Sequence, residues 1–390
     1  MPKATAIIPL WNGEQWIRPC LTALARQREG TPFALEVIVV DNGSVDRAPA
    51  IVQSEFPDAR LIRNSRNLGF AGGCNVGLAA ATGDLLVLLN QDTLVQPGWL
   101  AGLARALNDP QVGIAGSLAL LPDGATVQHA GGIIDWPLGI ARHRGQGESL
   151  AGPWKESAEV AFVTAASLAM RREVWEKIGS LDEGFGPGYY EDVDLCLRAQ
   201  AAGYGVVYAP ASRLLHSESG SFTDSPFTRW ARLRGRLRFC LKHLPPQRFL
   251  HEFLPAEADY QPTVLAGDRQ GQVARAYLEA IPMVLELWHS PAATDEIRER
   301  AILSLCRLCP PLTPATPPAQ RIPPPGQPLL TPSPLDRIPL LGRLRRGLHQ
   351  LAIFYAERRE RELLALLEDQ QEAIDRLQKE NARLRERPQD

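Results

Sequence analysis

The stretch LEVIVVDNGSVD, residues 35–46, joins an unbroken apolar run to a cluster of polar, turn-forming residues. The run lacks the polar alternation of a half-exposed strand, which indicates a strand of a parallel sheet that is covered on both faces. In open α/β sheets, ligands bind beyond the carboxyl ends of the strands. Asp41 ends this strand, so it is a candidate for binding a base or a ribose hydroxyl. A cap on the following helix explains the same residue equally well.

Short apolar runs of the same kind lie on both sides of this stretch. The further expected strands cover residues 4–10, 59–63 and 84–90, and the expected helices cover residues 15–28, 47–56 and 71–80. Such alternation of strands and helices predicts a doubly wound α/β sheet with right-handed crossovers. A turn signal within residues 112–135 predicts a hairpin, and residues 205–209 predict one more strand.

A glycine-rich segment, RNLGFAGGCNVG at residues 66–77, lies between the third expected strand and a helix. Closely spaced glycines let a backbone approach a ligand or adopt a positive φ. The spacing is not that of a dinucleotide-binding G-x-G-x-x-G, and it follows no first strand, which counts against a dehydrogenase. An ordinary loop with a helix start is the alternative explanation.

The strand over residues 84–90 runs directly into Asn90-Gln91-Asp92-Thr93. A carboxylate at the mouth of a buried strand is well placed to hold a divalent cation together with diphosphate oxygens, because Mg²⁺ prefers oxygen ligands and usually binds through one or two carboxylates plus phosphate. The alternative is a turn or a helix cap before Pro97.

Three acids, Glu191, Asp192 and Asp194, open a helix that follows a loop rich in glycine. The helix dipole favours acids at this place, which is the structural explanation. A loop that presents a carboxylate to a cleft also suits a general base, which must reach the hydroxyl that it activates. His216 follows the last expected strand, and it has a functional meaning only if the fold brings it to Asp92.

Residues 228–243 predict a basic helix with six Arg or Lys side chains and no acid. Contact with anionic lipid and packing on the rest of the chain explain it equally well. A proline-crowded segment at residues 310–339 predicts a stiff linker. The stretch 352–387 then predicts a long helix, whose apolar residues fit a heptad with Asn381 at a core position. We expect a dimerising coiled coil there, with a single solvated helix as the alternative.

The composition is that of a soluble globular protein, with 45% hydrophobic and 22% charged residues. A net charge of −2 argues against a protein whose whole surface binds nucleic acid. The six cysteines do not form the two pairs of a zinc site, and neither a signal peptide nor an apolar run of spanning length is present. We therefore expect a cytoplasmic protein with free thiols and, at most, peripheral contact with the inner face of the membrane.

Taken together, these segments resemble the family 2 glycosyltransferases with the GT-A fold, especially the rhamnosyltransferase-like branch. The resemblance covers residues 4–222 and depends on the order of several motifs. They are IIPLWNGEQW, VVDNGSVD, RNLGFAGGCNVG, LVLLNQDT, GFGPGYYEDVDLCLRAQAAGY and the later His216. It implies a Rossmann-like mixed sheet flanked by helices. The expected domains are a catalytic domain over 1–225, a helical extension over 226–309, the linker over 310–340 and the long helix over 341–390.

The resemblance also implies roles for individual residues. The donor would be bound by Pro9, Trp11, Glu14, Asp41, Asn67, Gly69, Gly73 and Asn90. Asp92 would hold Mg²⁺ or Mn²⁺ with His216 as a second ligand. Asp192, paired with Glu191, would be the catalytic base of an inverting transfer from a nucleotide-diphosphate sugar to a glycan or polyprenyl-linked acceptor. Rhamnose is the sugar that the resemblance favours, and cell-surface polysaccharide synthesis is the setting.

The chain departs from the family at Asn90, where the most familiar motif has Asp, and at Gln91, where Pro often stands. Similar Asn-x-Asp versions occur in the rhamnosyltransferase-like branch. One fewer charge should weaken metal binding while the donor is absent. The main alternative is a catalytically silent sugar-nucleotide-binding scaffold that dimerises through its C-terminal helix. A nucleotidyltransferase is a second alternative, but it would require a Gly-rich, basic loop after the first strand, where this chain has residues 9–13.

Overall fold

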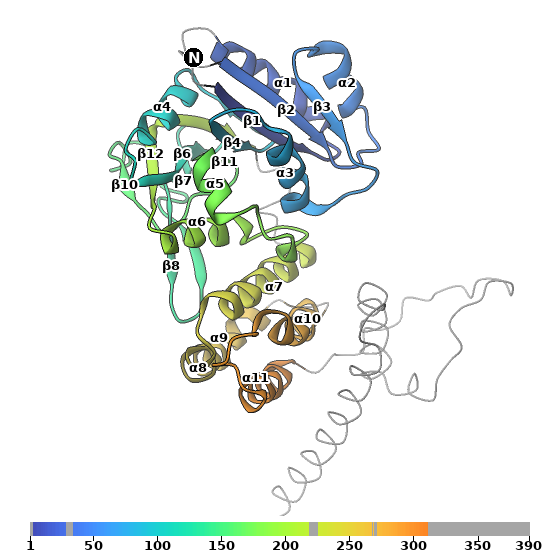
Figure 1. Cartoon of the computed structure of the whole chain (residues 1–390), viewed down its shortest axis with the longest axis vertical. Coiled ribbons are helices and arrows are strands. Elements are labelled where there is room, and N and C mark those ends of the chain that lie inside the picture. Colours follow the sequence, from blue (N-terminus) through green and yellow to red (C-terminus); the bar gives the residue numbers. More distant parts are fainter. Residues whose placement is uncertain (1–2, 29–33, 218–224, 267, 269–270, 311–390) are drawn as a thin grey trace, which may run out of the picture. The chain divides into compact units, whose positions relative to one another are not determined.

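The computed structural model describes residues 3–28, 34–217, 225–266, 268 and 271–310 (Figure 1). The predicted coiled coil and nearly all of the predicted linker therefore lie outside the described residues. One compact unit, Met1–Pro311, contains both the sheet and the helices that follow it. The domain boundary predicted after residue 225 falls inside this unit and stays a prediction.

The main sheet has ten strands in the described part of the chain, and most of them lie in the order β10-β12-β6-β11-β4-β1-β2-β3. Short strands β5 and β7 pair with β12 and β6. The strands are β1 (Lys3–Leu10), β2 (Ala34–Asp41), β3 (Arg60–Arg63), β4 (Leu85–Leu89), β5 (Thr93–Val95), β6 (Val112–Leu120), β7 (Val127–His129), β10 (Ala158–Glu159), β11 (Ser167–Arg171) and β12 (Gly205–His216). Strands β1 to β4 are parallel, whereas β11 runs antiparallel to both β4 and β6. The sheet is mixed, as the resemblance implies.

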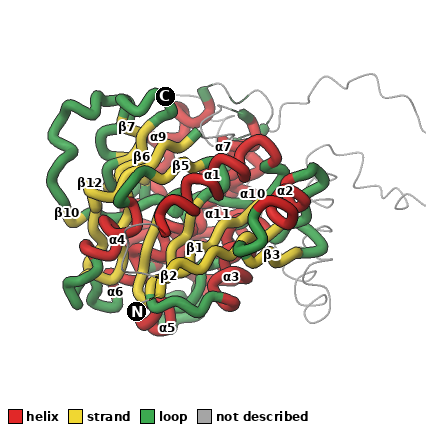
Figure 2. The backbone as a smooth tube through the Cα atoms, turned by 90° about the horizontal axis from the view of Figure 1, so that it is seen from above, coloured by secondary structure: helices red, strands yellow, loops and turns green. Residues whose placement is uncertain are grey.

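Helices cover both faces of this sheet (Figure 2). The helices are α1 (Glu14–Ala25), α2 (Ala48–Glu55), α3 (Gly69–Ala80), α4 (Trp99–Ala106), α5 (Arg172–Ile178) and α6 (Glu191–Ala201), with short 3-10 turns η1 (Arg26–Arg28) and η2 (Glu183–Phe185). Successive residues of β1 face opposite layers, since Ile7 packs in the cluster that contains α3 and Ile8 in the cluster that contains α1. The unbroken apolar runs are thus buried on both sides, and the predicted layer arrangement is confirmed.

The close packing of α3 on the sheet explains part of the glycine-rich segment. A Cβ at Gly77 would lie 2.3 Å from the Cγ2 of Ile7, so only glycine fits at this contact. Helix α3 begins at Gly69, two residues before the predicted start. The segment is therefore mostly helix, and its glycines shape the helix–sheet packing as well as the loop.

Two features differ from the expected strand pattern. The strand predicted over residues 205–209 continues to His216, because a register irregularity between Ala209 and Arg213 accommodates Pro210 within the strand. A second hairpin, β8 (Gly132–Asp135) with β9 (Ile140–His143), was not predicted. In Figure 1 this hairpin reaches toward α7, where Trp136 stacks on Phe239 at 5.6 Å between ring centroids.

The chain continues after residue 225 as a helical extension. Its elements are α7 (Pro226–His243), α8 (Pro246–Arg248), the π-helical turn η3 (Phe249–Phe253), α9 (Leu254–Leu265), α10 (Gln272–Leu287) and α11 (Asp295–Leu308). Their apolar faces join the core cluster that also contains α3 and α6. None of the helices described is long and apolar enough to cross a bilayer.

Candidate active site

A cavity of about 740 Å³ lies where the ends of several elements meet. Asn90 after β4, Glu191 and Asp192 at the start of α6, and His216 at the end of β12 all line it. Its other walls come from β9, α7 and α9, so the helical extension closes one side of the cavity. Four residues predicted from three separate parts of the sequence therefore line one cavity.

Asp192 is half-buried and is oriented by backbone donors. Its Oδ2 accepts a hydrogen bond from Ala165 N at 3.1 Å, and its Oδ1 accepts one from Val193 N at 2.8 Å. Burial raises the pKa of this carboxyl above its ordinary value, although these backbone hydrogen bonds lower it in part. A raised pKa makes a carboxylate a stronger proton acceptor, which suits a general base.

Glu191 precedes Asp192 but is more deeply buried and less well hydrogen-bonded. Its side chain is 5% exposed, and its Oε2 has no hydrogen-bond partner within the described residues. Burial, followed by the negative charge of Asp192, raises the pKa of Glu191 to about 8. Two neighbouring carboxyls in one apolar site do not both ionise readily. Backbone donors stabilise a negative charge on Asp192, whereas Glu191 Oε2 has no such donor among the described residues, so Asp192 is the carboxyl of the pair that ionises more readily.

The pairing of β12 with β5 brings His216 to Asp92, since His216 lies opposite Thr93 in the sheet. The imidazole Nε2 is 3.2 Å from Asp92 Oδ1 and 3.4 Å from Asn90 Nδ2. Its Nδ1 lies 2.8 Å from Gln128 Oε1, which can only accept a hydrogen bond. The neutral ring therefore carries its proton on Nδ1 and presents a lone pair at Nε2.

These residues fit a divalent cation only in part. Asn90 Oδ1 is buried without a hydrogen-bond partner among the residues described, and the Nδ2 of the same amide lies near the His216 nitrogen that contacts Asp92. Two oxygens and an imidazole nitrogen suit Mg²⁺ or Mn²⁺. The described ranges contain no group of three His, Cys, Asp or Glu side chains that could hold a metal ion. Oxygens from a diphosphate would have to complete the coordination.

The remaining predicted donor residues cluster at the ends of β1 and β2, outside the lining of this cavity. Asn42 connects two of them, because its Nδ2 donates to Asn67 Oδ1 at 3.0 Å and to Gly69 O at 2.8 Å. A Cβ at Gly73 would lie 3.1 Å from the same Asn42 amide and 3.4 Å from Pro9 Cβ. The structure thus brings Pro9, Asn67, Gly69 and Gly73 together around one asparagine.

Asp41, Trp11 and Glu14 have different surroundings. Asp41 is 1% exposed, and its two carboxylate oxygens accept hydrogen bonds from Ser44 N at 2.8 Å and Arg63 Nε at 3.2 Å. Trp11 is 52% exposed, and Glu14 forms an ion pair with Arg47 at 3.2 Å. Asp41 is therefore a buried residue that stabilises this edge of the sheet through its hydrogen bonds, whereas Trp11 is exposed at the surface.

Two histidines in the cavity wall were not predicted as a pair. The Nδ1 atoms of His129 and His143 are 2.8 Å apart, and His129 Nε2 accepts a hydrogen bond from Thr164 N at 3.3 Å. Burial lowers the pKa of His129 well below its ordinary value and that of His143 to about 4, so both rings are neutral. Only the unpredicted hairpin brings these histidines together, so no local sequence signal could have found the pair.

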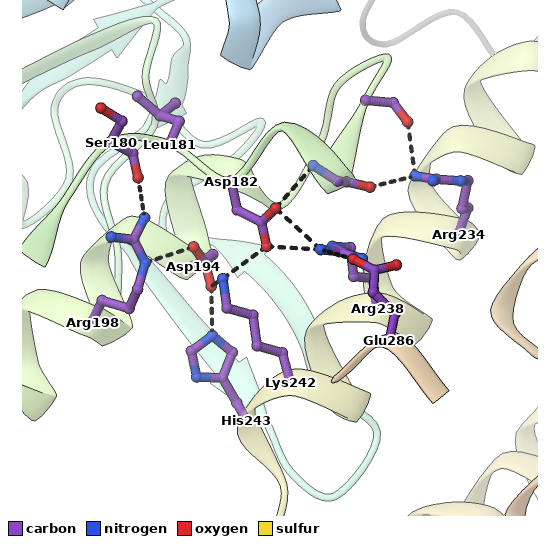
Figure 3. Close-up of polar contacts among 12 residues, drawn as sticks. Ser180, Leu181, Asp182, Asp194, Arg198, Arg234, Arg238, Lys242, His243 and Glu286 are labelled. Carbon is purple, nitrogen blue, oxygen red and sulfur yellow. Dashed lines mark hydrogen bonds and ion pairs between the residues drawn. The ribbon is translucent and has the colours of Figure 1, made fainter. Parts of the chain in front are cut away.

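The basic helix α7 faces inward to a large extent (Figure 3). Arg234 pairs with Glu279 at 3.0 Å, Arg236 with Glu257 at 2.7 Å, and Arg238 with both Asp182 and Glu286. Of the two explanations left open for this helix, packing on the rest of the chain accounts for these side chains.

Known proteins resemble this chain in sequence. The sequence model of the family described as Glycosyl transferase family 2 matches residues 5–178. A protein of Sinorhizobium fredii described as uncharacterized is 33% identical over 279 residues, which are 67% of this chain and 29% of that protein. The O-antigen biosynthesis protein RfbC of Myxococcus xanthus is 32% identical over 56% of this chain and 18% of its own length. The chain thus spans less than a third of these two relatives.

A shorter relative is covered more fully. The N-acetylglucosaminyl-diphospho-decaprenol L-rhamnosyltransferase of Mycobacterium tuberculosis is 28% identical over 52% of this chain and 73% of that protein. Among solved structures, the mannosyltransferase PcManGT of Pyrobaculum calidifontis aligns with 79% of this chain and 86% of its own, at 19% identity and a TM-score of 0.48.

Proposed function

Residues 5–178 form a domain of glycosyl transferase family 2, and from this premise we propose that the chain is an inverting glycosyltransferase. It transfers a sugar, for which we favour rhamnose, from a nucleotide-diphosphate donor to a hydroxyl of a glycan or lipid-linked acceptor. One observation carries the proposal. The oriented carboxylate of Asp192 lines the same cavity as Asn90 and His216, the residues next to the candidate cation site.

Asp192 is the base of the proposed reaction. Ala165 N and Val193 N hold its two oxygens at the wall of the cavity. The hydroxyl proton moves to Asp192 while the oxygen bonds to the anomeric carbon. The bond between that carbon and the diphosphate oxygen breaks on the opposite face, so a single displacement inverts the anomeric centre. Glu191 keeps its proton in this proposal, so no second negative charge lies beside the carboxylate of Asp192.

Asp92, His216 and the orphaned Oδ1 of Asn90 would hold a divalent cation in this proposal. A bound Mg²⁺ or Mn²⁺ would neutralise the charge that develops on the leaving diphosphate. Gln128 orients His216 from the opposite side of the ring and thereby fixes which nitrogen faces the site. Position 90 is Asn where the most familiar family motif has Asp, so the site has one negative charge fewer. Oxygens of the donor diphosphate would therefore complete the coordination of the cation.

The cluster at the ends of β1 and β2 is the proposed place for the nucleoside. The exposed ring of Trp11 offers a stacking surface, and Gln91 holds the Trp11 backbone through a hydrogen bond of 3.0 Å to its N–H. Glu14 and Asp41 support the neighbouring loop, while Asn67, Gly69 and Gly73 form the side nearest α3. Pro9 packs against Gly73 in this cluster.

The far side of the cavity is the proposed place for the acceptor. Arg229 and Arg232 of α7 line it together with Phe227, Tyr260 and Val264. A wall with both cationic and apolar side chains suits an acceptor that carries a phosphate and a hydrocarbon chain. The name of the M. tuberculosis relative describes an acceptor of this chemistry, which supports the lipid-linked class for this chain.

A panel of nucleoside diphosphates and nucleotide sugars, screened by thermal shift with Mn²⁺ and then by release of free sugar, tests the proposal. We expect one nucleotide to stabilise the protein and its sugar conjugate to be hydrolysed slowly without acceptor. Stabilisation by a nucleotide without any hydrolysis or transfer would instead support the silent binding scaffold. No stabilisation by any nucleotide would contradict both.

A further inference from the structure

Helix α7 is fastened to the segment from Asp182 to Asp194, which contains the proposed base Asp192. Lys242 Nζ lies 2.8 Å from Asp182 Oδ2 and 2.8 Å from Asp194 Oδ1, so one ammonium group bridges the two ends of this segment (Figure 3). Arg238 adds a contact to Asp182 at 3.1 Å, and His243 Nε2 adds one to Asp194 at 2.9 Å. We call these five side chains the Asp182–Asp194 clamp.

The middle of the segment is held by the same helix. Arg234 donates hydrogen bonds to the carbonyl oxygens of Gly184 and Gly186, at 3.0 and 2.7 Å. Gly235 lies directly against the segment, because a Cβ there would be 2.7 Å from Tyr189 O. Helix α7 thus contacts the start, the middle and the end of the segment.

The segment contains an unfavourable backbone conformation just before the base. Tyr189 and Tyr190 have φ values of +77° and +74°, which side-chain-bearing residues rarely adopt. Such conformations persist only where the surrounding structure determines them. Glu191 and Asp192 follow directly, so the position of the carboxylate depends on this turn.

Asp194 has no part in proton transfer. Its side chain is 0% exposed, and Arg198 occupies its second oxygen at 2.8 Å. Burial alone would raise the pKa of Asp194. The hydrogen bond from His243 and the charges of Arg198 and Lys242 outweigh burial and hold that pKa well below its ordinary range. Asp194 is therefore a permanent anion that faces α7 rather than the cavity.

We propose that Asp194 and Lys242 are positioning residues, through which the helical extension holds the strained Tyr189–Tyr190 turn and sets the place of Asp192 in the cavity. This inference rests on the proposed role of Asp192 as base. It assigns the extension a part in catalysis, and it gives the third acid of the Glu191–Asp194 motif a function distinct from that of the first two.

Two variants of the full chain test the clamp. Lys242→Met removes the bridge, and Asp194→Asn removes the anion. Arg248→Met is the matched control, because it removes a basic side chain whose exposed ion pair with Glu252 joins α8 to η3. We expect kcat to fall about 10²-fold in the clamp variants, as for a misplaced catalytic group, while the donor KM stays within about twofold. Lys242→Arg, which keeps a cation of similar reach, should restore most of kcat.

Amide hydrogen exchange gives a readout that does not need activity. The amides of residues 184–192 should exchange at least tenfold faster in Lys242→Met than in the wild type or Arg248→Met, since the turn is no longer held. Unchanged exchange, or kcat equal to that of the control, would overturn the inference. If the wild type transfers no sugar, the proposed function fails, but the exchange result still decides whether the clamp holds the turn.

Discussion

The Nε2 atom of His216 lies 3.2 Å from Oδ1 of Asp92, although the two residues come from different strands. Gln128 engages the other ring nitrogen, so Nε2 is the nitrogen that faces the carboxylate. A proton or a metal ion between the two atoms makes such a contact favourable. The proposed cation would be held by this nitrogen and this carboxylate together.

Removal of either partner should weaken donor binding only where a metal is present. Asp92→Ala and His216→Ala remove proposed ligands, and Gln128→Leu releases the imidazole ring, which typically costs about 10–100-fold in metal affinity. Calorimetry of nucleotide binding with and without Mn²⁺ measures the effect, with Arg248→Met as control. Equal losses in the absence of Mn²⁺ would contradict a metal-linked role.

Glu191 should make stability fall as the pH rises. Its pKa is about 8 in the folded protein, against an ordinary value of 4.5, so between these values the folded state keeps a proton that the unfolded state has lost. Glu191→Gln removes this titration. The variant should therefore gain stability over the wild type with rising pH, by at most about 1.4 kcal/mol per pH unit.

Urea denaturation at several pH values across that window provides the measurement. Glu183→Gln is a useful control, because this acid lies in the same segment and lines no part of the cavity. A stability difference between Glu191→Gln and the wild type that does not vary with pH would show that Glu191 is ionised throughout.

Replacing only one member of the buried ion pair between Arg236 and Glu257 should strongly destabilise the folded protein. Glu257 is 0% exposed and accepts two hydrogen bonds of 2.7 Å from the guanidinium and one of 2.5 Å from Tyr277. Glu257→Leu leaves Arg236 charged and buried, with an expected loss of about 3–5 kcal/mol. The double variant Arg236→Met with Glu257→Leu should recover most of this loss in urea unfolding. A strictly additive double variant would mean that the two groups do not interact.

Gly77 tests the contact between α3 and β1. Gly77→Ala places a methyl group against Ile7 in a filled core, so overpacking should destabilise the protein by about 1–3 kcal/mol. Ala79→Ser, on the exposed face of the same helix, should change the free energy of unfolding little. Chemical denaturation of both variants measures the difference, and a Gly77→Ala protein as stable as the control would show that the layers are looser than described.

Local patterns were sufficient to predict the central sheet. Buried strands such as β2 and β4 have unbroken apolar runs, and their polar ends place Asp41 and Asn90 at one edge because parallel strands share a direction. The mixed sheet is confirmed, as is the hairpin expected within residues 112–135, where β6 pairs with β7. Local patterns could not predict the encounter of His216 with Asp92, which only the family resemblance implied, because it depends on an antiparallel pairing with the three-residue strand β5.

For the helical extension, local sequence patterns could not predict which residues its basic side chains contact. The sequence of α7 has many cations and no acid, which is equally typical of a lipid-binding helix and of one that packs on acids elsewhere. The partners Asp182, Glu257, Glu279 and Glu286 come from a loop before η2, from α9 and from α10, and only the tertiary fold reveals them. The roles of the predicted donor, metal and catalytic residues likewise stay predictions until ligands and variants are measured.

The most direct test of the central proposal is sugar transfer by Asp192→Asn, compared with the wild type, on the donor found in the nucleotide screen. This change keeps the shape of the side chain and removes the proton acceptor. The proposal predicts that turnover falls by about 10²–10⁴-fold, the usual contribution of a general base, while calorimetry gives an unchanged donor affinity. Near-normal transfer by Asp192→Asn would contradict the assignment of Asp192 as the base.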